Sequence, residues 1–226
     1  MIVLGIETAG ARGGVALLRD GQPPREVVLE GSRILGAELA PTIKRLLREA
    51  NPGRAPDLIA VDVGPGSYTG LRIGIAAAKG LAFAWGCPLL GVGAADALAA
   101  ATPDVERALV VFDASRGEVW AARYQRREGT LALEGEPTLC APAALEAGAA
   151  RPSVVLGDAA AQVVDPARGL LPASPGRDWP SALEVARLAR ERHMGGERQD
   201  ALRVAPIYFR PNEAEEQRRK RGLRVK

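Results

Sequence analysis

Apolar residues in the first half of the chain form short runs that are separated by polar turns. The run 58–63 is almost continuously apolar, which is typical of a strand covered on both faces. Apolar positions three and four residues apart predict a helix over about 39–50 and a longer one over 69–85. The longer helix is expected to join two parallel strands. In this half, strands are expected at 2–7, 14–18, 26–30, 58–63 and 89–92.

The same pattern restarts after residue 100. The apolar run 108–113 ends in Asp113, as the first strand ends in Glu7, and a short turn leads from each into another strand. Farther on, Ser181 and Glu184 have the spacing of a capping box at the start of a helix. We therefore expect two lobes of similar topology, 1–100 and 101–226, the second with strands near 130–133 and 153–156, a short Ala-rich helix after Pro142 and a helix over 181–192.

Two lobes that each open with an acid-tipped hairpin describe the α/β fold of actin, the sugar kinases and Hsp70, in which each mixed sheet is flanked by helices. Nucleotide-using proteins of that fold hold phosphates in the two turns and magnesium at the strand-end acids. The matching candidates here are Glu7, Asp113 and Arg116. Glu7 is longer than the usual Asp, and the turn 114–117 contains a single glycine. We interpret the three as the remnant of a nucleotide site, in which Arg116 either contacts a phosphate or faces solvent.

The loop before the longer helix is rich in residues with special backbone roles. Gly64 and Gly66 permit conformations closed to other residues, Pro65 stiffens the turn, and Ser67 and Thr69 are candidate N-caps. The Lys-Ser/Thr pair of a P-loop is missing, and the glycines miss the dinucleotide-binding spacing by one residue. Two interpretations stay open: a loop that contacts phosphate, or a tight connection between strand and helix.

The helix over 69–85 is apolar nearly all round, with Arg72 and Lys79 as its only charged residues. Such a helix must be buried on most sides. Small residues recur at every fourth position and line one smooth face, which either packs on the protein's own sheet or binds a partner helix. The predicted partner interface consists of Gly70, Leu71, Gly74, Ala77, Ala78, Leu81 and Ala82. A membrane span is not expected, because it needs ~20 uncharged apolar residues.

Composition narrows the class of function. The 226 residues are 47% apolar and 4% aromatic, which predicts a large aliphatic core. Cys87 and Cys140 lack ligand spacing, and the apolar N-terminus breaks too early for a signal peptide, so reduced thiols and a cytoplasmic location are expected. His193 is the single histidine, so no metal site with two histidines is expected.

The net charge of +3 conceals an asymmetry. Residues 218–226 contain six basic side chains and no acid, which leaves −3 for the rest of the chain. Such a tail either adds phosphate contacts to a nucleic-acid complex or stays solvated, and the second is the commoner case.

Three motifs resemble those of one family. The run 64–74, GPGSYTGLRIG, resembles the signature of the bacterial TsaB (YeaZ) family in the actin-like group, with Gly64, Pro65, Gly66, Ser67, Thr69 and Arg72 as the matching loop residues. Residues 113–120 are similar to the family's Asp-Ala-Arg-x-x-Glu-Val-aromatic hairpin except at Ser115, and 206–210 resemble its Pro-x-Tyr-x-Arg. The departures, Glu7 for Asp and no His near Ser32, put a nucleotide role of the first hairpin in doubt.

This resemblance implies a non-catalytic subunit that forms a heterodimer with the metal- and nucleotide-binding paralogue TsaD, joined by the ATPase TsaE. Their joint product is N6-threonylcarbamoyladenosine in tRNAs that read codons beginning with A, and tRNA is reached through the complex. A homodimer is expected when the chain is alone. No tightly bound cofactor is expected, and a nucleotide only at the subunit interface. The alternatives are a small-molecule kinase or ATPase of the actin-like fold, and a peptidase, for which no nucleophile motif accompanies His193.

Overall fold

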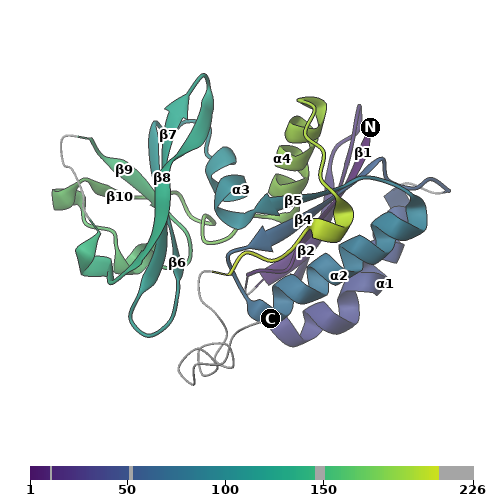
Figure 1. Ribbon diagram of the computed structural model, residues 1–226, viewed down its shortest axis with the longest axis horizontal. Coiled ribbons are helices and arrows are strands. Elements are labelled where there is room, and N and C mark those ends of the chain that lie inside the picture. Colours follow the sequence, from purple (N-terminus) through teal and green to yellow (C-terminus); the bar gives the residue numbers. More distant parts are fainter. Residues whose placement is uncertain (11, 51–52, 146–150, 209–226) are drawn as a thin grey trace.

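The computed structural model describes residues 1–10, 12–50, 53–145 and 151–208, which form two lobes with a five-stranded mixed sheet in each (Figure 1). The first sheet has the order β3-β2-β1-β4-β5. Its first three strands pair antiparallel, whereas β1, β4 and β5 run parallel. The strands are β1 (Ile2–Glu7), β2 (Arg12–Arg19), β3 (Arg25–Glu30), β4 (Leu58–Gly64) and β5 (Leu89–Gly93). All five confirm predicted strands.

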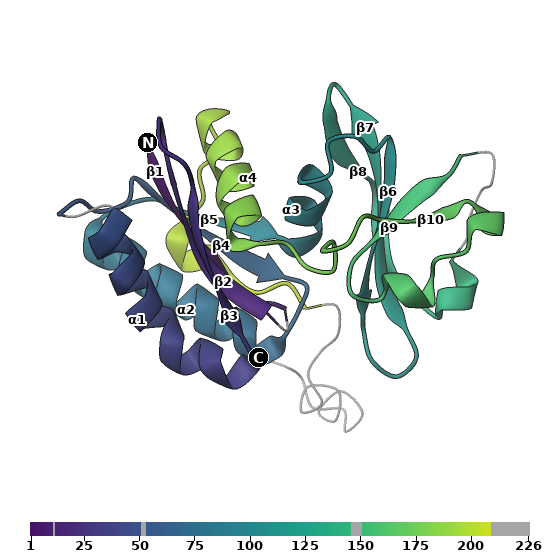
Figure 2. The ribbon, with the colours of Figure 1, turned by 180° about the vertical axis from the view of Figure 1, so that it is seen from behind.

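Helices cover both faces of the first sheet. On one face lie α1 (Ser32–Ala50) and α2 (Tyr68–Trp85), and on the other lie α3 (Ala94–Ala100) and α4 (Ala182–Met194) (Figures 1 and 2). The strand period of two divides the core, since Leu4 and Ile6 pack with α1 and α2 while Val3 packs with α4. The structure extends the helix predicted over 39–50 back to Ser32, and adds α3, which the sequence reasoning missed.

The second sheet repeats the order of the first. It runs β10-β9-β6-β7-β8, so that its strands match β5-β4-β1-β2-β3 in chain order, which confirms the expected similarity of the lobes. Its strands are β6 (Arg107–Asp113), β7 (Val119–Arg127), β8 (Thr130–Cys140), β9 (Ser153–Leu156) and β10 (Leu170–Pro172). The helix predicted after Pro142 is a single 3₁₀ turn, Pro142–Ala144, among the described residues, and 146–150 lie outside them.

The chain returns to the first lobe before it ends. α4 lies on β1 and β2, and the Ala182 carbonyl approaches Gly5 so closely that no side chain fits there. The segment 197–208, which we call the strap, also stays on this lobe: Ile207 N donates to Val63 O (2.7 Å). The predicted C-terminal lobe, 101–226, therefore needs a correction, since residues 182–208 belong to the first lobe.

The two lobes meet through α3, which lies between α4 and the second sheet (Figure 2). Its alanines let the strands approach, and Leu98 packs with Phe112 and Leu156. Beside this core, Asp96 accepts hydrogen bonds from Tyr124 Oη and Arg192 Nη2, both at 2.8 Å, which ties β7 to α4. No helix in the described part of the chain is long and apolar enough to cross a membrane.

Candidate binding face and interlobe cleft

The glycine loop packs against the first hairpin. Ser67 N donates to Ala9 O (2.8 Å), and a Cβ at Gly66 would lie 2.6 Å from Ala9 Cβ. Gly64 has φ of 101°, a left-handed conformation that glycine adopts without strain. Ser67 is the N-cap of α2, since its Oγ accepts from Gly70 N at 3.2 Å. The loop is therefore a tight connection from β4 to α2, the second of the two interpretations.

The smooth face of α2 lies inside the protein. Its buried members are Gly70, Leu71, Gly74, Ala78 and Ala82. A Cβ at Gly70 would overlap the Thr8 carbonyl oxygen, and a Cβ at Gly74 would overlap the Thr8 hydroxyl. The glycines are needed because the turn after β1 touches the helix backbone. The prediction that this face binds a partner is wrong for these five residues, and the alternative, packing within the protein, is confirmed.

A second apolar side of α2 is open to solvent. α1 runs beside it in both views (Figures 1 and 2). Side chains of the two helices line a groove of about 420 Å³, which we call the α1–α2 groove. Ala77 and Leu81, the two remaining members of the predicted interface, lie in it and are half-buried. The lining residues are Ala40, Ile43, Lys44, Leu47, Ala76, Ala77, Gly80, Leu81 and Trp85. A groove with a single charged lining residue is typical of a protein-binding surface.

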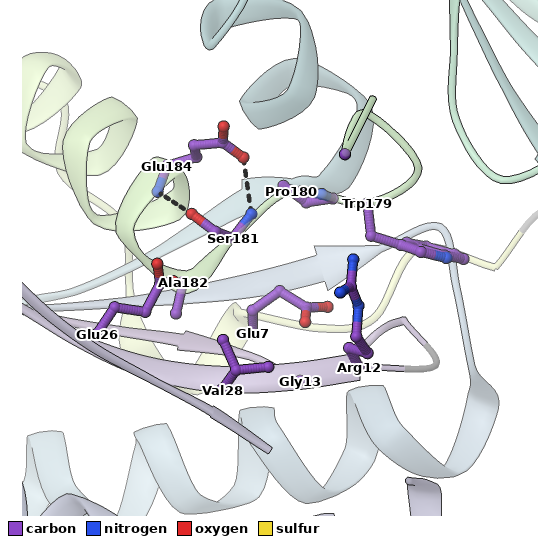
Figure 3. A pocket seen from close by; sticks show the side chains of 11 residues that line it. Glu7, Arg12, Gly13, Glu26, Val28, Trp179, Pro180, Ser181, Ala182 and Glu184 are labelled. Atoms are coloured by element: carbon purple, nitrogen blue, oxygen red, sulfur yellow. Dashed lines mark hydrogen bonds between the residues drawn. The ribbon is translucent and has the colours of Figure 1, made fainter. Parts of the chain in front are cut away.

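Strands β1, β2 and β3 and the start of α4, with the loop before it, line a small pocket (Figure 3). The Trp179 ring stacks on Phe112, with 4.6 Å between centroids, and a Cβ at Gly10 would lie 2.9 Å from that ring. A cavity of about 170 Å³ remains, lined by Glu7, Arg12, Gly13, Glu26, Val28, Gly176, Trp179, Pro180, Ser181, Ala182 and Glu184. Sites for small organic ligands enclose roughly 300–1,000 Å³. This cavity is therefore too small for a nucleotide.

The capping box beside the cavity is present as predicted. Ser181 Oγ accepts from Glu184 N (3.2 Å), and Glu184 Oε2 accepts from Ser181 N (2.7 Å), as the dashed lines in Figure 3 show. Leu183 N, in the same first turn of α4, donates to Glu26 Oε1 (3.0 Å). Backbone donors at this helix start are thus satisfied by the protein's own carboxylates, which leaves fewer of them for an external anion.

Glu7 and Asp62 form a buried carboxyl pair at the ends of β1 and β4. Glu7 Oε1 accepts from Ala9 N (2.6 Å) and Gly10 N (3.0 Å), and Asp62 Oδ1 accepts from Gly64 N (2.6 Å). Burial, and then the Asp62 charge, raise the pKa of Glu7 well above its ordinary value. Burial raises the pKa of Asp62 to about 7, and Glu7 hydrogen-bonds to it. Near neutral pH the pair therefore holds a proton between its carboxyl groups. The sequence signal for Asp62 was an acid inside an apolar strand.

Asp113 and Arg116 lie apart from Glu7. Both are exposed, and neither lines the cavity that Glu7 lines. Asp113 Oδ1 accepts from Ser115 N (2.7 Å) within a turn where Ser115 and Arg116 have φ of 62° and 60°. The residues predicted as a remnant nucleotide site do not share a cavity. Among the described residues, no three His, Cys, Asp or Glu side chains are grouped so that they could hold a metal ion.

Comparison with known proteins identifies the family. The model of the family TsaD, tRNA N6-adenosine threonylcarbamoyltransferase, matches residues 31–166. The Bacillus subtilis tRNA threonylcarbamoyladenosine biosynthesis protein TsaB is 36% identical over 135 residues, 58% of either chain. The Escherichia coli protein of the same name is 35% identical over 149 residues, 61% of either chain. The chain belongs to the TsaD-type family as a TsaB (YeaZ) member. Its matched part spans less than two thirds of these curated TsaB proteins.

A solved structure extends the TsaB likeness to nearly the whole fold. YeaZ from Pseudomonas aeruginosa superposes with a TM-score of 0.79 at 28% identity, over 92% of this chain and 99% of that one. The superposition includes both lobes, and it agrees with the repeated strand order described above. The two-lobed actin-like fold expected from the sequence is therefore confirmed.

Two TsaB motifs that are far apart in the sequence meet in space. Arg72 Nε donates to Tyr208 Oη (3.0 Å), and the Arg72 guanidinium lies 4.0 Å from the centroid of the Tyr68 ring. Tyr68 and Tyr208 stack with their centroids 4.9 Å apart. Thr69, also in the signature loop, is exposed, whereas Pro65 is buried. The sequence reasoning found both motifs but not this contact, by which the signature loop holds the end of the strap.

Proposed function

We propose that this chain is a non-catalytic subunit of the machinery that makes N6-threonylcarbamoyladenosine in tRNA, and that it acts by forming a heterodimer with a TsaD-type paralogue. The relatives from B. subtilis and E. coli are named for the biosynthesis of this nucleoside. The observation that carries the proposal is the open apolar groove between α1 and α2, on a molecule whose pocket beside Glu7 is too small for a nucleotide.

The region that the TsaD model matches supports a TsaD-type partner. Residues 31–166 include α1 and α2, so a TsaD-type protein is similar to this chain where the groove lies. Related faces can pair about a pseudo-twofold axis, as identical faces do in homodimers. Two such helix pairs would bury the apolar side chains of Leu47, Leu81 and Trp85 between them. By the same argument, two copies of this chain would pair through the groove when no paralogue is present.

The remaining parts of the machinery enter the proposal through this heterodimer. The ATPase TsaE joins the pair, and the assembled complex, rather than this chain alone, binds tRNAs that read codons beginning with A. A nucleotide belongs at the subunit interface and not in the interlobe cleft, which the Trp179 ring and the 170 Å³ cavity support. The site of action is the cytoplasm.

A charge placed in the groove tests the proposal. Leu81→Asp should raise the Kd for the TsaD-type protein of the same organism more than a hundredfold, or ~2.7 kcal/mol, because the carboxylate would be buried against apolar side chains. Leu139→Asp on β8, where Leu139 is 38% exposed, is the matched control and should pair within twofold of the unaltered chain. Calorimetric titration measures both, and circular dichroism checks folding. Unchanged pairing of a folded Leu81→Asp chain would rule out the groove as the partner face.

A further inference from the structure

The two most exposed large apolar side chains of the described residues both lie on one flank of α2. Phe83 is 92% exposed and Leu202 is 83% exposed. The chain has three phenylalanines, and its other large apolar residues are mostly buried. Large apolar side chains that stay in water do not contribute the hydrophobic free energy of burial. Neighbouring exposed apolar side chains are therefore characteristic of a surface that another protein covers.

Helix geometry places Phe83 next to the α1–α2 groove. Ala76, Gly80 and Phe83 are spaced i, i+4 and i+7 and therefore share one stripe of α2. Ala76 and Gly80 line the groove, and nothing lies within 4 Å of a Cβ built on Gly80. Along this stripe, the small residues Ala76 and Gly80 are followed by the exposed aromatic ring of Phe83.

The strap brings Leu202 to the same flank. Lys79, one turn before Phe83, donates from Nζ to Leu202 O at 2.8 Å. A 3₁₀ turn, Ala201–Arg203, presents Leu202 outward, and it is capped because Asp200 Oδ1 accepts from Leu202 N at 3.0 Å. Ala201 packs on the core from the other side of this turn. The exposed position of Leu202 is therefore held by the fold.

The size of a stable interface requires contacts outside the groove. Specific protein pairs bury roughly 20–30 residues a side. The groove has nine lining residues, fewer than half of that number. A partner seated in it must cover neighbouring surface, and the apolar neighbours along the stripe are Phe83 and, across Lys79, Leu202.

We propose that the TsaD-type paralogue covers Phe83 and Leu202 together with the groove, so that the strap forms part of the heterodimer interface. This inference rests on the proposed function. Phe83 enters a hole between side chains of the partner's helices, and Leu202 packs beside it. The strap thereby joins the two subunits, and the same segment is fastened to the signature loop through Tyr208 and Arg72.

Three serine variants of the full chain test the extension. Phe83→Ser should weaken pairing with the TsaD-type protein at least tenfold, Leu202→Ser about threefold to tenfold, and the double variant more than either. Met194→Ser is the control, because Met194 is 70% exposed but sits at the end of α4, on the opposite face of the first sheet. The control should pair within twofold. All three sites are exposed, so unchanged thermal midpoints are expected.

The outcomes separate this inference from the function on which it rests. If Leu81→Asp abolishes pairing while the Phe83 and Leu202 variants pair as the unaltered chain does, the extension is wrong and the heterodimer stands. If Leu81→Asp also pairs normally, the groove itself is wrong. If the serine variants weaken only self-association, measured by sedimentation of the chain alone, Phe83 and Leu202 belong to a homodimer, which also overturns the inference.

Discussion

The cleft pocket that Trp179 lines and the α1–α2 groove differ in size and in lining. The cleft pocket has a mixed lining that includes the carboxylates of Glu7, Glu26 and Glu184, and it measures about 170 Å³. The groove is apolar, contains Lys44 as its single charged lining residue and is open over about 420 Å³. In other proteins of this fold, the cleft holds nucleotides. Here the larger and more apolar of the two hollows is the α1–α2 groove, on the outside of the first lobe.

This difference illustrates that a fold can be retained while its functional sites change. The strand order of the two lobes is retained, but the first hairpin turn is packed against Ser67 and the Trp179 ring. Apolar side chains of α1 and α2 remain accessible to solvent in the groove, where a bound protein could bury them. This arrangement agrees with the proposed binding of a TsaD-type protein by the groove.

Leucine at two glycines of α2 should have opposite consequences. Gly70→Leu is expected to prevent folding, because its Cβ already overlaps the Thr8 carbonyl oxygen and the backbone cannot move away. Gly80→Leu should fold with a thermal midpoint near that of the unaltered chain, since the space around Gly80 is open. It should nevertheless fail to pair, because the leucine fills the groove. Circular dichroism and sedimentation measure the two properties, and a folded Gly70→Leu chain would contradict the packing described for α2.

Removal of the ring in the cleft should affect stability but not pairing. Trp179→Ala is expected to lower the free energy of unfolding by about 2–3 kcal/mol, below the usual cost for a buried tryptophan because the ring is half-buried. Pairing with the TsaD-type protein should be unchanged, since Trp179 does not line the groove. Urea denaturation and calorimetric titration measure these quantities. A selective loss of pairing would place the partner at the cleft.

The buried acids should make the protein less stable as pH rises. The pKa of Asp62 is raised to about 7 from its ordinary 3.8, so the folded state holds a proton that the unfolded state releases. The contribution of Asp62 to the free energy of unfolding is therefore largest below about pH 4 and falls, by at most ~1.4 kcal/mol per pH unit, until about pH 7. In Asp62→Asn the amide oxygen can still accept from Gly64 N while its NH₂ donates to Glu7.

The decline with pH should thus be smaller in Asp62→Asn than in the unaltered chain. Urea midpoints between pH 5 and pH 8 measure it. Asp104→Asn, at an exposed position, serves as the control and should keep the original slope. Equal slopes in all three proteins would show that Asp62 is ionised in the folded state.

The basic tail should have the smallest effect. Residues 218–226 lie outside the described residues, and their six charges were expected from the sequence to stay solvated. Deletion of 218–226 should leave the pairing unchanged, and the salt dependence of tRNA binding by the complex should change by less than the ~0.7 that one phosphate contact adds to the slope. A flatter slope after deletion would show that the tail binds phosphates.

The sequence predicted the strands well because apolar runs bounded by glycine and proline identify buried strands directly. It predicted the position of α2, but five of the seven residues that it assigned to the partner interface are buried within the protein. Small residues line both sides of α2, and only the approach of Thr8, more than sixty residues earlier in the chain, shows that Gly70 and Gly74 are internal. Ala76 and Gly80 are also small residues four positions apart, so spacing alone could not show which side of the helix is buried.

Long-range contacts explain the other differences. Trp179 closes the cleft by stacking on Phe112, and Tyr208 returns to Arg72; neither pairing leaves a signal in the local sequence. The same holds for α4, whose capping box was predicted but whose return to the first lobe was not. Hydrogen bonds to Val63 and Gly91, which are distant in the sequence, hold the strap on the first lobe. The exposed position of Leu202 beside α2 could therefore be recognised only from the structure.

The central claim is that the groove, and not the cleft, makes this chain necessary for tRNA modification. The most direct test is the rate of threonylcarbamoyladenosine formation with purified TsaD-type protein, TsaE, tRNA, ATP and a threonylcarbamoyl donor, using variants of this chain at saturating concentration. The account predicts that Glu7→Gln and Asp113→Asn stay within tenfold of the unaltered chain, and that Leu81→Asp reduces the rate more than a hundredfold. A hundredfold loss in the folded, pairing-competent acid variants, with Leu81→Asp active, would contradict it.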